Sequence, residues 1–216
     1  VAHEVTNVGS DRDQLSSMAK QAREAIGSET LSVVADRGYF KSEEVLACHD
    51  AKITAYVPKP MTSGAKADGR FNKDAFVFNA ARNEYVCPAG EALIWRFSSV
   101  EKGLNMHCYW SSNCQSCALK TQCTPTKQRR VRRWEHEAVL DEMQSRLNHA
   151  PDMMRIRKRT VEHPFGTLKQ WMGSTHFLTR RLVGVSAEMS LNVLAYNMKR
   201  VMRIIGAEGL LKAMAA

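Results

Sequence analysis

The sequence lacks the features of a membrane or secreted protein. No apolar run approaches the roughly 18 residues that a membrane-spanning helix needs. No basic segment followed by an apolar one opens the chain, so no secretory signal is expected. Internal repeats and low-complexity tracts are also missing. These absences lead us to expect a soluble, cytoplasmic protein.

The composition is that of a globular protein. Of 216 residues, 44% are hydrophobic and 25% are charged, which is enough apolar material for a packed core. The length allows one domain with an insertion or two small domains. The chain opens without Met on a segment that alternates like a strand, so we expect Val1 to be a cut through a larger protein.

The charge balance points to a polyanionic partner. The net charge is +9 and the pI is about 9.4, and nucleic acid is the commonest partner of such proteins. Cations concentrate in KQRRVRR at 127–133 and RIRKR at 155–159. A solvated surface is the alternative explanation of both runs, and it stays open.

Hydrophobic periodicity predicts an α/β fold in the first part of the chain. The expected elements are a strand over 1–8, a helix over 12–27 capped by Asp11, a strand over 31–36, a helix from Ser42 and a strand over 53–59. This βαβαβ order favours a partly parallel sheet.

The character of the sequence changes twice after that. Residues 1–60 are expected to form the first part of an α/β domain, and 61–133 an inserted subdomain that holds five of the six cysteines. Residues 134–216 should complete the domain with helices. We expect these helices over about 134–148, 152–172 and 186–205.

Two acidic residues are candidates for catalysis. Asp36 ends the apolar run LSVVAD, and open α/β sheets bind ligands at the carboxyl ends of their strands. A helix-capping or turn role is the alternative for Asp36. Glu162 shares a helical face with Phe165 and Lys169, and Pro164 should kink or interrupt the helix just after it. A surface ion-pair network is the alternative there.

Several motifs resemble those of a known family. VADRGYF, then VEHPFGTLKQWMG, then EMSLNVLAYNMKRV, together with VTNVGSDRDQL, CPAG and CQSCALKTQC, resemble bacterial insertion-sequence transposases of the DDE superfamily. The resemblance implies an RNase H-like mixed sheet with a cysteine-rich insertion and C-terminal helices, truncated at its N-terminus. It also implies that Asp36 is the second catalytic Asp, that Glu162 is the catalytic Glu, and that Lys169 contacts DNA.

The resemblance further implies the chemistry. Asp36 and Glu162 would hold two Mg²⁺ ions that stabilise the attacking and leaving oxygens during DNA cleavage and strand transfer. DNA, both transposon ends and target, is the implied partner, with a homodimer in a synaptic complex as a further expectation. The first catalytic Asp should lie upstream of Val1, so we expect the fragment alone to be inactive.

The sequence departs from the family pattern before the Glu. Arg155 and Lys158 stand at the offsets where the family often has Tyr and Arg, while Arg157 or Arg159 would need a shift of one residue. We therefore assign DNA binding loosely to Arg155, Lys158 and Arg159, beside Lys169.

The cysteines form a second candidate site. Cys114 and Cys117 have C-x2-C spacing, and with Cys87 and Cys123 they supply four thiolates, enough for a structural, tetrahedral Zn²⁺ site. An iron–sulfur cluster and reduced cysteines without metal are the alternatives. Cys108 and His107 are spare ligand candidates.

Three functions are compatible with these patterns. The first is a DDE transposase, the second a catalytically dead DNA-binding remnant of one, and the third a metal-containing nucleic-acid-binding module. A pure binding module needs no convergent carboxylates, so the pair of Asp36 and Glu162 favours the first two.

Overall fold

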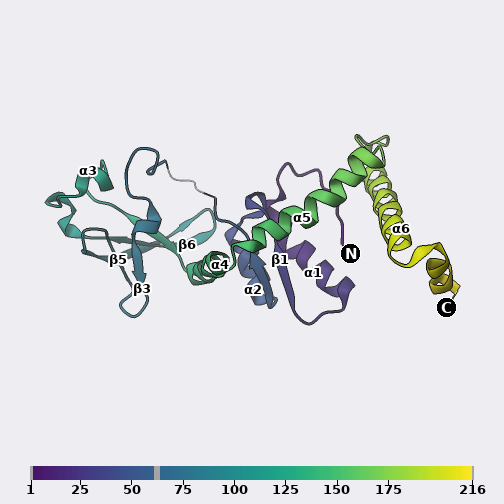
Figure 1. The fold of residues 1–216 in the computed structure, drawn as a ribbon. Coiled ribbons are helices and arrows are strands. Elements are labelled where there is room, and N and C mark those ends of the chain that lie inside the picture. The colour runs from purple at the N-terminus through teal and green to yellow at the C-terminus, as the bar shows by residue number, and fades with distance from the viewer. Residues whose placement is uncertain (1, 61–63, 216) are drawn as a thin grey trace. The chain divides into compact units, whose positions relative to one another are not determined.

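The computed structural model describes residues 2–60 and 64–215 (Figure 1), and of Glu162 it describes the backbone alone. The chain forms two compact units. The first unit joins Val1–Lys59 to Glu142–Ala216, and the second unit is Pro60–Asp141. Helices and strands are both present, which confirms the α/β class. The functional domain boundaries expected from the sequence stay a prediction.

The first unit contains a βαβ element, as its periodicity predicts. Strands β1 (Leu31–Val34) and β2 (Ile53–Tyr56) pair in parallel, with Leu31 opposite Ile53. Helix α2 (Ser42–Asp50) connects them and packs against β2. Among the described residues this sheet has two strands only, so the RNase H-like arrangement stays a prediction.

Helix α1 (Leu15–Ile26) covers α2 and β1. Its apolar stripe buries Leu15 and Ala19, while Val45 and Cys48 are buried on α2. The carboxylate of Glu44 accepts a hydrogen bond of 2.8 Å from the Ser16 amide, so it satisfies a donor in the first turn of α1.

Two details at the start of the chain differ from expectation. No strand forms over residues 2–8, because no described segment pairs with them, and alternation alone supplies no hydrogen-bonding neighbour. The cap before α1 also differs. A short 3₁₀ helix, η1 (Asp11–Asp13), precedes α1, and Ser10 rather than Asp11 caps it by accepting from the Arg12 amide.

The second unit is built on one antiparallel sheet in which each strand pairs with the next. Its strands are β3 (Val77–Asn79), β4 (Glu84–Val86), β5 (Ala92–Glu101), β6 (Leu104–Trp110) and β7 (Val131–Trp134). Short helices lie around it: η3 (Lys73–Ala75), η4 (Ser112–Gln115) and α3 (Lys120–Cys123). The buried core consists of Phe76, Tyr85, Leu93, Tyr109 and Val131.

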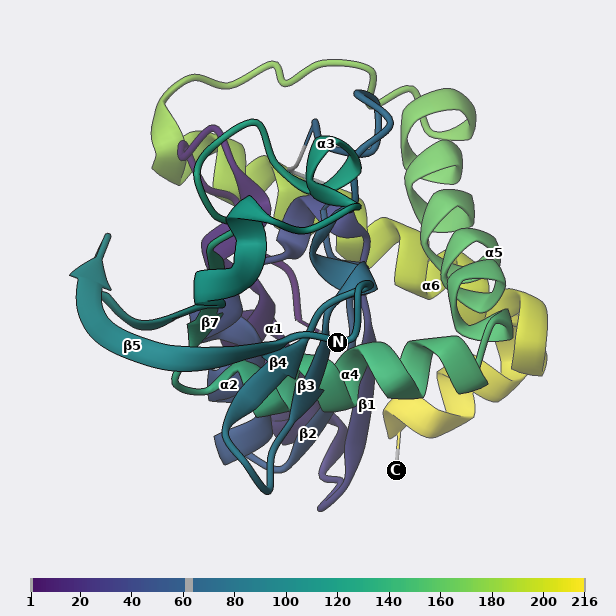
Figure 2. The same ribbon diagram turned by 90° about the vertical axis from the view of Figure 1, so that its left-hand side faces the viewer.

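Strand β5 is long and strongly curved (Figure 2). Its pairing with β6 shifts register between Trp95 and Phe97, and such a bulge bends the strand that carries it. Lys102 and Gly103 both have positive φ values, 52° and 83°, which suit a two-residue hairpin turn between the strands.

The remaining helices follow the sheet. They are α4 (Glu137–His149), α5 (Asp152–Gly166) and α6 (Arg181–Ala215), which is broken at Gly206. Pro164 lies inside α5, and the regular helix gives way three residues later to a π-helical segment, η5 (Thr167–Trp171). Over the described residues, no helix has the length and apolar character to cross a membrane.

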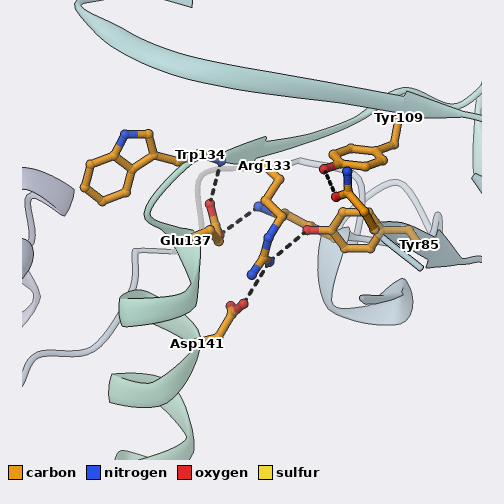
Figure 3. Close-up of polar contacts among 8 residues, drawn as sticks. Tyr85, Tyr109, Arg133, Trp134, Glu137 and Asp141 are labelled. Carbon is orange, nitrogen blue, oxygen red and sulfur yellow. Dashed lines mark hydrogen bonds and ion pairs between the residues drawn. The ribbon is translucent and has the colours of Figure 1, made fainter. Parts of the chain in front are cut away.

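Arg133 links the sheet of the second unit to the start of α4 (Figure 3). Its side chain is buried, lies 3.8 Å from the ring centre of Phe78, and donates to Tyr85 at 3.3 Å and to Asp141 at 2.8 Å. One turn earlier, Glu137 accepts from the Trp134 amide. A buried cation needs such partners, because transfer from water is otherwise costly.

Arg133→Ala should lower the free energy of unfolding by about 2–3 kcal/mol, because it removes a buried stack and two hydrogen bonds. The matched control is Arg132→Ala, whose half-exposed ion pair with Glu101 should contribute about 0–1 kcal/mol. Urea unfolding followed by tryptophan fluorescence measures both. Equal losses for the two variants would contradict the role assigned to Arg133.

Candidate catalytic and metal-binding sites

Asp36 lies at the carboxyl end of β1 and is held from two sides. One carboxylate oxygen accepts from the Gly38 amide at 2.8 Å and so caps η2 (Arg37–Tyr39). The other accepts from the Arg157 guanidinium at 2.7 Å. A Cβ at position 38 would lie 3.0 Å from the Asp36 carboxylate, so glycine gives the turn its close approach. Asp36 therefore has the capping role that was the alternative to catalysis, together with a long-range partner.

Arg157 places helix α5 beside β1 in the first unit (Figure 1). Its side chain is 22% exposed and that of Asp36 is 41% exposed, so the pair remains open to solvent. Arg157 occupies the half-buried stripe of α5 with Met153, Met154 and Val161. In the sequence, the helical spacing of Arg157 from these apolar residues already indicated that its side chain points inward. The comparison with the family's pattern led instead to Arg155, Lys158 and Arg159.

The other predicted basic residues on α5 and η5 point elsewhere. Arg155 pairs with Asp152 on its own helix at 2.9 Å. Lys158, Arg159 and Lys169 are exposed, and none of the three forms an ion pair with a described residue. Their charges are therefore accessible to a polyanion.

Glu162 follows Arg157 by five positions in α5, and its side chain lies outside the described residues. The expected proximity of the Asp36 and Glu162 carboxylates therefore stays a prediction. Within the described part of the chain, no group of three or more His, Cys, Asp or Glu side chains could hold a metal ion as it stands.

Four cysteines line one pocket of the second unit. Cys87, Cys114, Cys117 and Cys123 are among the residues that line a space of about 450 Å³, part of it open to solvent, with Arg129 in the same wall. Burial raises the pKa of the Cys123 thiol, Arg129 lowers it, and the other three thiols raise it further. All four are free thiols that line the same pocket.

The two remaining cysteines differ from these four. Cys48 is buried in α2, and burial raises its pKa to about 11. Cys108 is buried on β6, and burial raises its pKa as well. Neither lines the pocket of the other four, and His107 instead lies 2.6 Å from the Ser98 hydroxyl. Both thiols are suited to packing rather than to binding a metal.

The basic run 127–133 is used mainly within the second unit. Arg129 lies over the Phe76 ring and Arg130 over the Trp110 ring, each at 5.3 Å. Arg132 pairs with Glu101 at 2.5 Å, and Arg133 is buried. The run therefore contributes to packing within the second unit. It is neither entirely a solvated surface nor entirely a surface free to contact DNA.

A family model described as "Transposase DDE domain" matches residues 86–202, more than half of the 216 residues. The matched segment contains Glu162 and Lys169 but begins after Asp36. No curated protein and no solved structure matches the chain.

A double-mutant cycle on Asp36→Asn and Arg157→Ala should give a coupling energy of about 0.5–1 kcal/mol, discounted from a buried charged hydrogen bond because the pair is partly exposed. The same cycle with Arg155→Ala should give about zero, since Arg155 pairs within its own helix. Chemical denaturation of the four proteins in each cycle provides the energies. A coupling for Arg155 as large as that for Arg157 would rule out the specific tie between α5 and β1.

Proposed function

We propose, since the chain belongs to the transposase DDE domain family, that it cuts DNA and joins the strands during transposition of an insertion sequence. The match confirms the resemblance to DDE-superfamily transposases, and the matched segment includes the motif around Glu162 but not the one around Asp36. Transposase-type function and DNA as a partner follow from the family. The catalytic residues, their metal ions and the structural metal are parts of the proposal.

The observation that carries the proposal is the hydrogen bond between Asp36 and Arg157. It fixes the carboxylate at the end of β1 against α5, and α5 is the helix on which Glu162 stands. An acidic side chain at the carboxyl end of a strand, beside a helix with a second acidic residue, is the arrangement expected of a carboxylate-based active site. The family match over α5 supports the same assignment.

In this site Asp36 and Glu162 would hold divalent cations, of which Mg²⁺ suits their hard oxygen donors. Asp36 fits this role because it lies at a strand end and is 41% exposed, and each carboxylate oxygen keeps acceptor capacity beyond the one hydrogen bond that it accepts. The bound ions would stabilise charge on the attacking and leaving oxygens. Arg157 would orient the Asp36 carboxylate, and its own charge would limit repulsion between acidic groups.

The exposed cations of α5 and η5 would bind the DNA backbone. Lys158, Arg159 and Lys169 have no ion-pair partner among the described residues. Arg155 pairs with Asp152 on the surface, where a DNA phosphate would replace the carboxylate. Contacts to phosphate position a protein on DNA without reading its sequence. These residues would therefore hold the strand in register with the carboxylates.

The cysteine pocket would hold a structural Zn²⁺ ion. Four thiolates can complete a tetrahedral site with Zn–S distances of about 2.3 Å, which requires the four sulfurs to close around the ion. A Zn²⁺ ion with four thiolates would carry a net negative charge, and Arg129 in the pocket wall would offset part of it. The pocket lies where the chain has short helices, so the metal would fix the loops at this end of the sheet.

Asp36→Asn and Glu162→Gln should each reduce metal-dependent cleavage of the element's ends by on the order of 1,000-fold, because each removes one charge that binds the ions. The assay uses the full-length reading frame, with Mg²⁺ or Mn²⁺ and labelled transposon ends. The control is Asp152→Asn, an exposed carboxylate on the same helix that pairs with Arg155. It should cleave at the normal rate. Full cleavage by Asp36→Asn would remove that residue from the active site and favour a structural role for its contact with Arg157.

Purified protein should contain about one zinc per chain, and Cys117→Ser should lose it, because three thiolates hold Zn²⁺ less tightly than four. Cys108→Ala provides the control, since this cysteine is buried outside the pocket and should leave the zinc content unchanged. Elemental analysis distinguishes zinc from iron. Folded protein without bound metal, or equal metal loss in both variants, would refute the site.

A further inference from the structure

A second pocket opens in the first unit between two helical segments. One wall consists of His163, Thr167 and Trp171, from the end of α5 and from η5. The space is about 610 Å³, part of it open to solvent. His163 directly follows the proposed catalytic Glu162 in the chain.

The other wall, from α6, is strongly basic. Tyr196, Lys199, Arg200 and Arg203 line it. Lys199 and Arg203 are four residues apart, so they stand on the same face of the helix, where like charges repel. None of these three cations pairs with a carboxylate among the described residues. A pocket with three unpaired cations attracts a polyanion.

Trp171 gives the pocket an aromatic surface. Its side chain is 81% exposed, although tryptophan is usually largely buried. The residue ends η5, and π-helical turns occur often at functional sites. An exposed indole next to a row of cations is the combination with which proteins bind unpaired nucleotides, because the base stacks on the ring and the phosphate contacts the cations.

We propose that this pocket binds a nucleotide of an unpaired DNA strand, with the base against Trp171 and the adjoining phosphates on Lys199, Arg200 and Arg203. The inference rests on the proposed function, which it extends by assigning a strand-holding site next to the catalytic helix. The occupant is an unpaired nucleotide rather than intact duplex, because in a duplex the faces of the bases are already stacked on their neighbours.

The experiment measures binding of labelled oligothymidylate to the full chain by fluorescence anisotropy. Trp171→Ala should weaken binding by about 5- to 100-fold, the range for loss of one stacked base. Its matched control is Trp95→Ala, another exposed tryptophan, which lies in the second unit and should bind as the unaltered chain does. Equal affinity of the Trp171→Ala variant and the unaltered chain would overturn the proposal.

The cations are tested by their salt dependence. The double variant Lys199→Ala, Arg203→Ala should bind more weakly, and the slope of log affinity against log salt should fall by about 0.7 for each phosphate that the variant no longer neutralises. The control is Lys212→Ala, an exposed cation of α6 outside the pocket that pairs with Glu208. An equal change of slope in this control would mean a diffuse effect of net charge and would overturn the assigned site.

Three further ligands separate the possible occupants. An abasic strand should bind more weakly than oligothymidylate and be insensitive to Trp171→Ala, and a short duplex should be insensitive as well. Duplex binding that depends on Trp171 as strongly as strand binding does would overturn the choice of unpaired DNA. If millimolar inorganic phosphate displaces the strand completely at constant ionic strength, the pocket is a simple anion site and the proposal fails.

The outcome is independent of the test of the proposed function. Normal strand binding by Trp171→Ala together with loss of cleavage in Asp36→Asn would leave the transposase assignment intact and refute only the nucleotide pocket. Strand binding that requires Trp171, with cleavage unaffected by Asp36→Asn and Glu162→Gln, would support the pocket and refute the catalytic residues.

Discussion

Asp36 accepts a hydrogen bond from Arg157, which lies 121 positions further along the chain. The first unit depends on contacts of this kind, because it is assembled from two segments with the whole of the second unit between them. Closing so long a loop costs conformational entropy, although the cost grows only slowly with its length. Contacts between α5 and β1 must offset that cost, and the ion pair also fixes which face of α5 meets the end of β1. The proposed active site inherits its geometry from this constraint.

The second unit is one continuous segment, and it has a hydrophobic core of its own. Tyr85 on β4 and Tyr109 on β6 are buried, with their ring centres 5.3 Å apart, and Arg133 stacks on Phe78 beside them. The inserted segment can therefore form its sheet from neighbouring strands alone, each paired with the next along the chain. Such local connectivity lets an insertion fold without disturbing the segments that flank it.

Arginine and lysine have opposite uses in the two units. In the second unit, Arg129, Arg130 and Arg133 lie over aromatic rings, so their charges contribute to packing. On α5, η5 and α6 the cations other than Arg157 are exposed, and most of those described have no carboxylate partner. The chain carries a net charge of +9. Its exposed, unpaired cations lie mainly on the C-terminal helices, because several arginines of the second unit pack on aromatic rings. We expect DNA to contact those helices first.

The sequence by itself determined the features that depend on neighbours along the chain. The alternation and spacing of apolar residues predicted α1, β1, α2 and β2, because these periods decide which face of a helix or strand is buried. The cysteine spacing likewise predicted a group of four, and the structure has those four in the wall of one pocket.

Tertiary structure decided the rest. It selected Arg157 from a run of four cations, since only that side chain faces Asp36. It left residues 2–8 without strand pairing, because a strand needs a partner that alternation cannot supply. It also brought Trp171 of η5 and Arg200 of α6 to one pocket. Local sequence patterns do not predict which helical segments pack together.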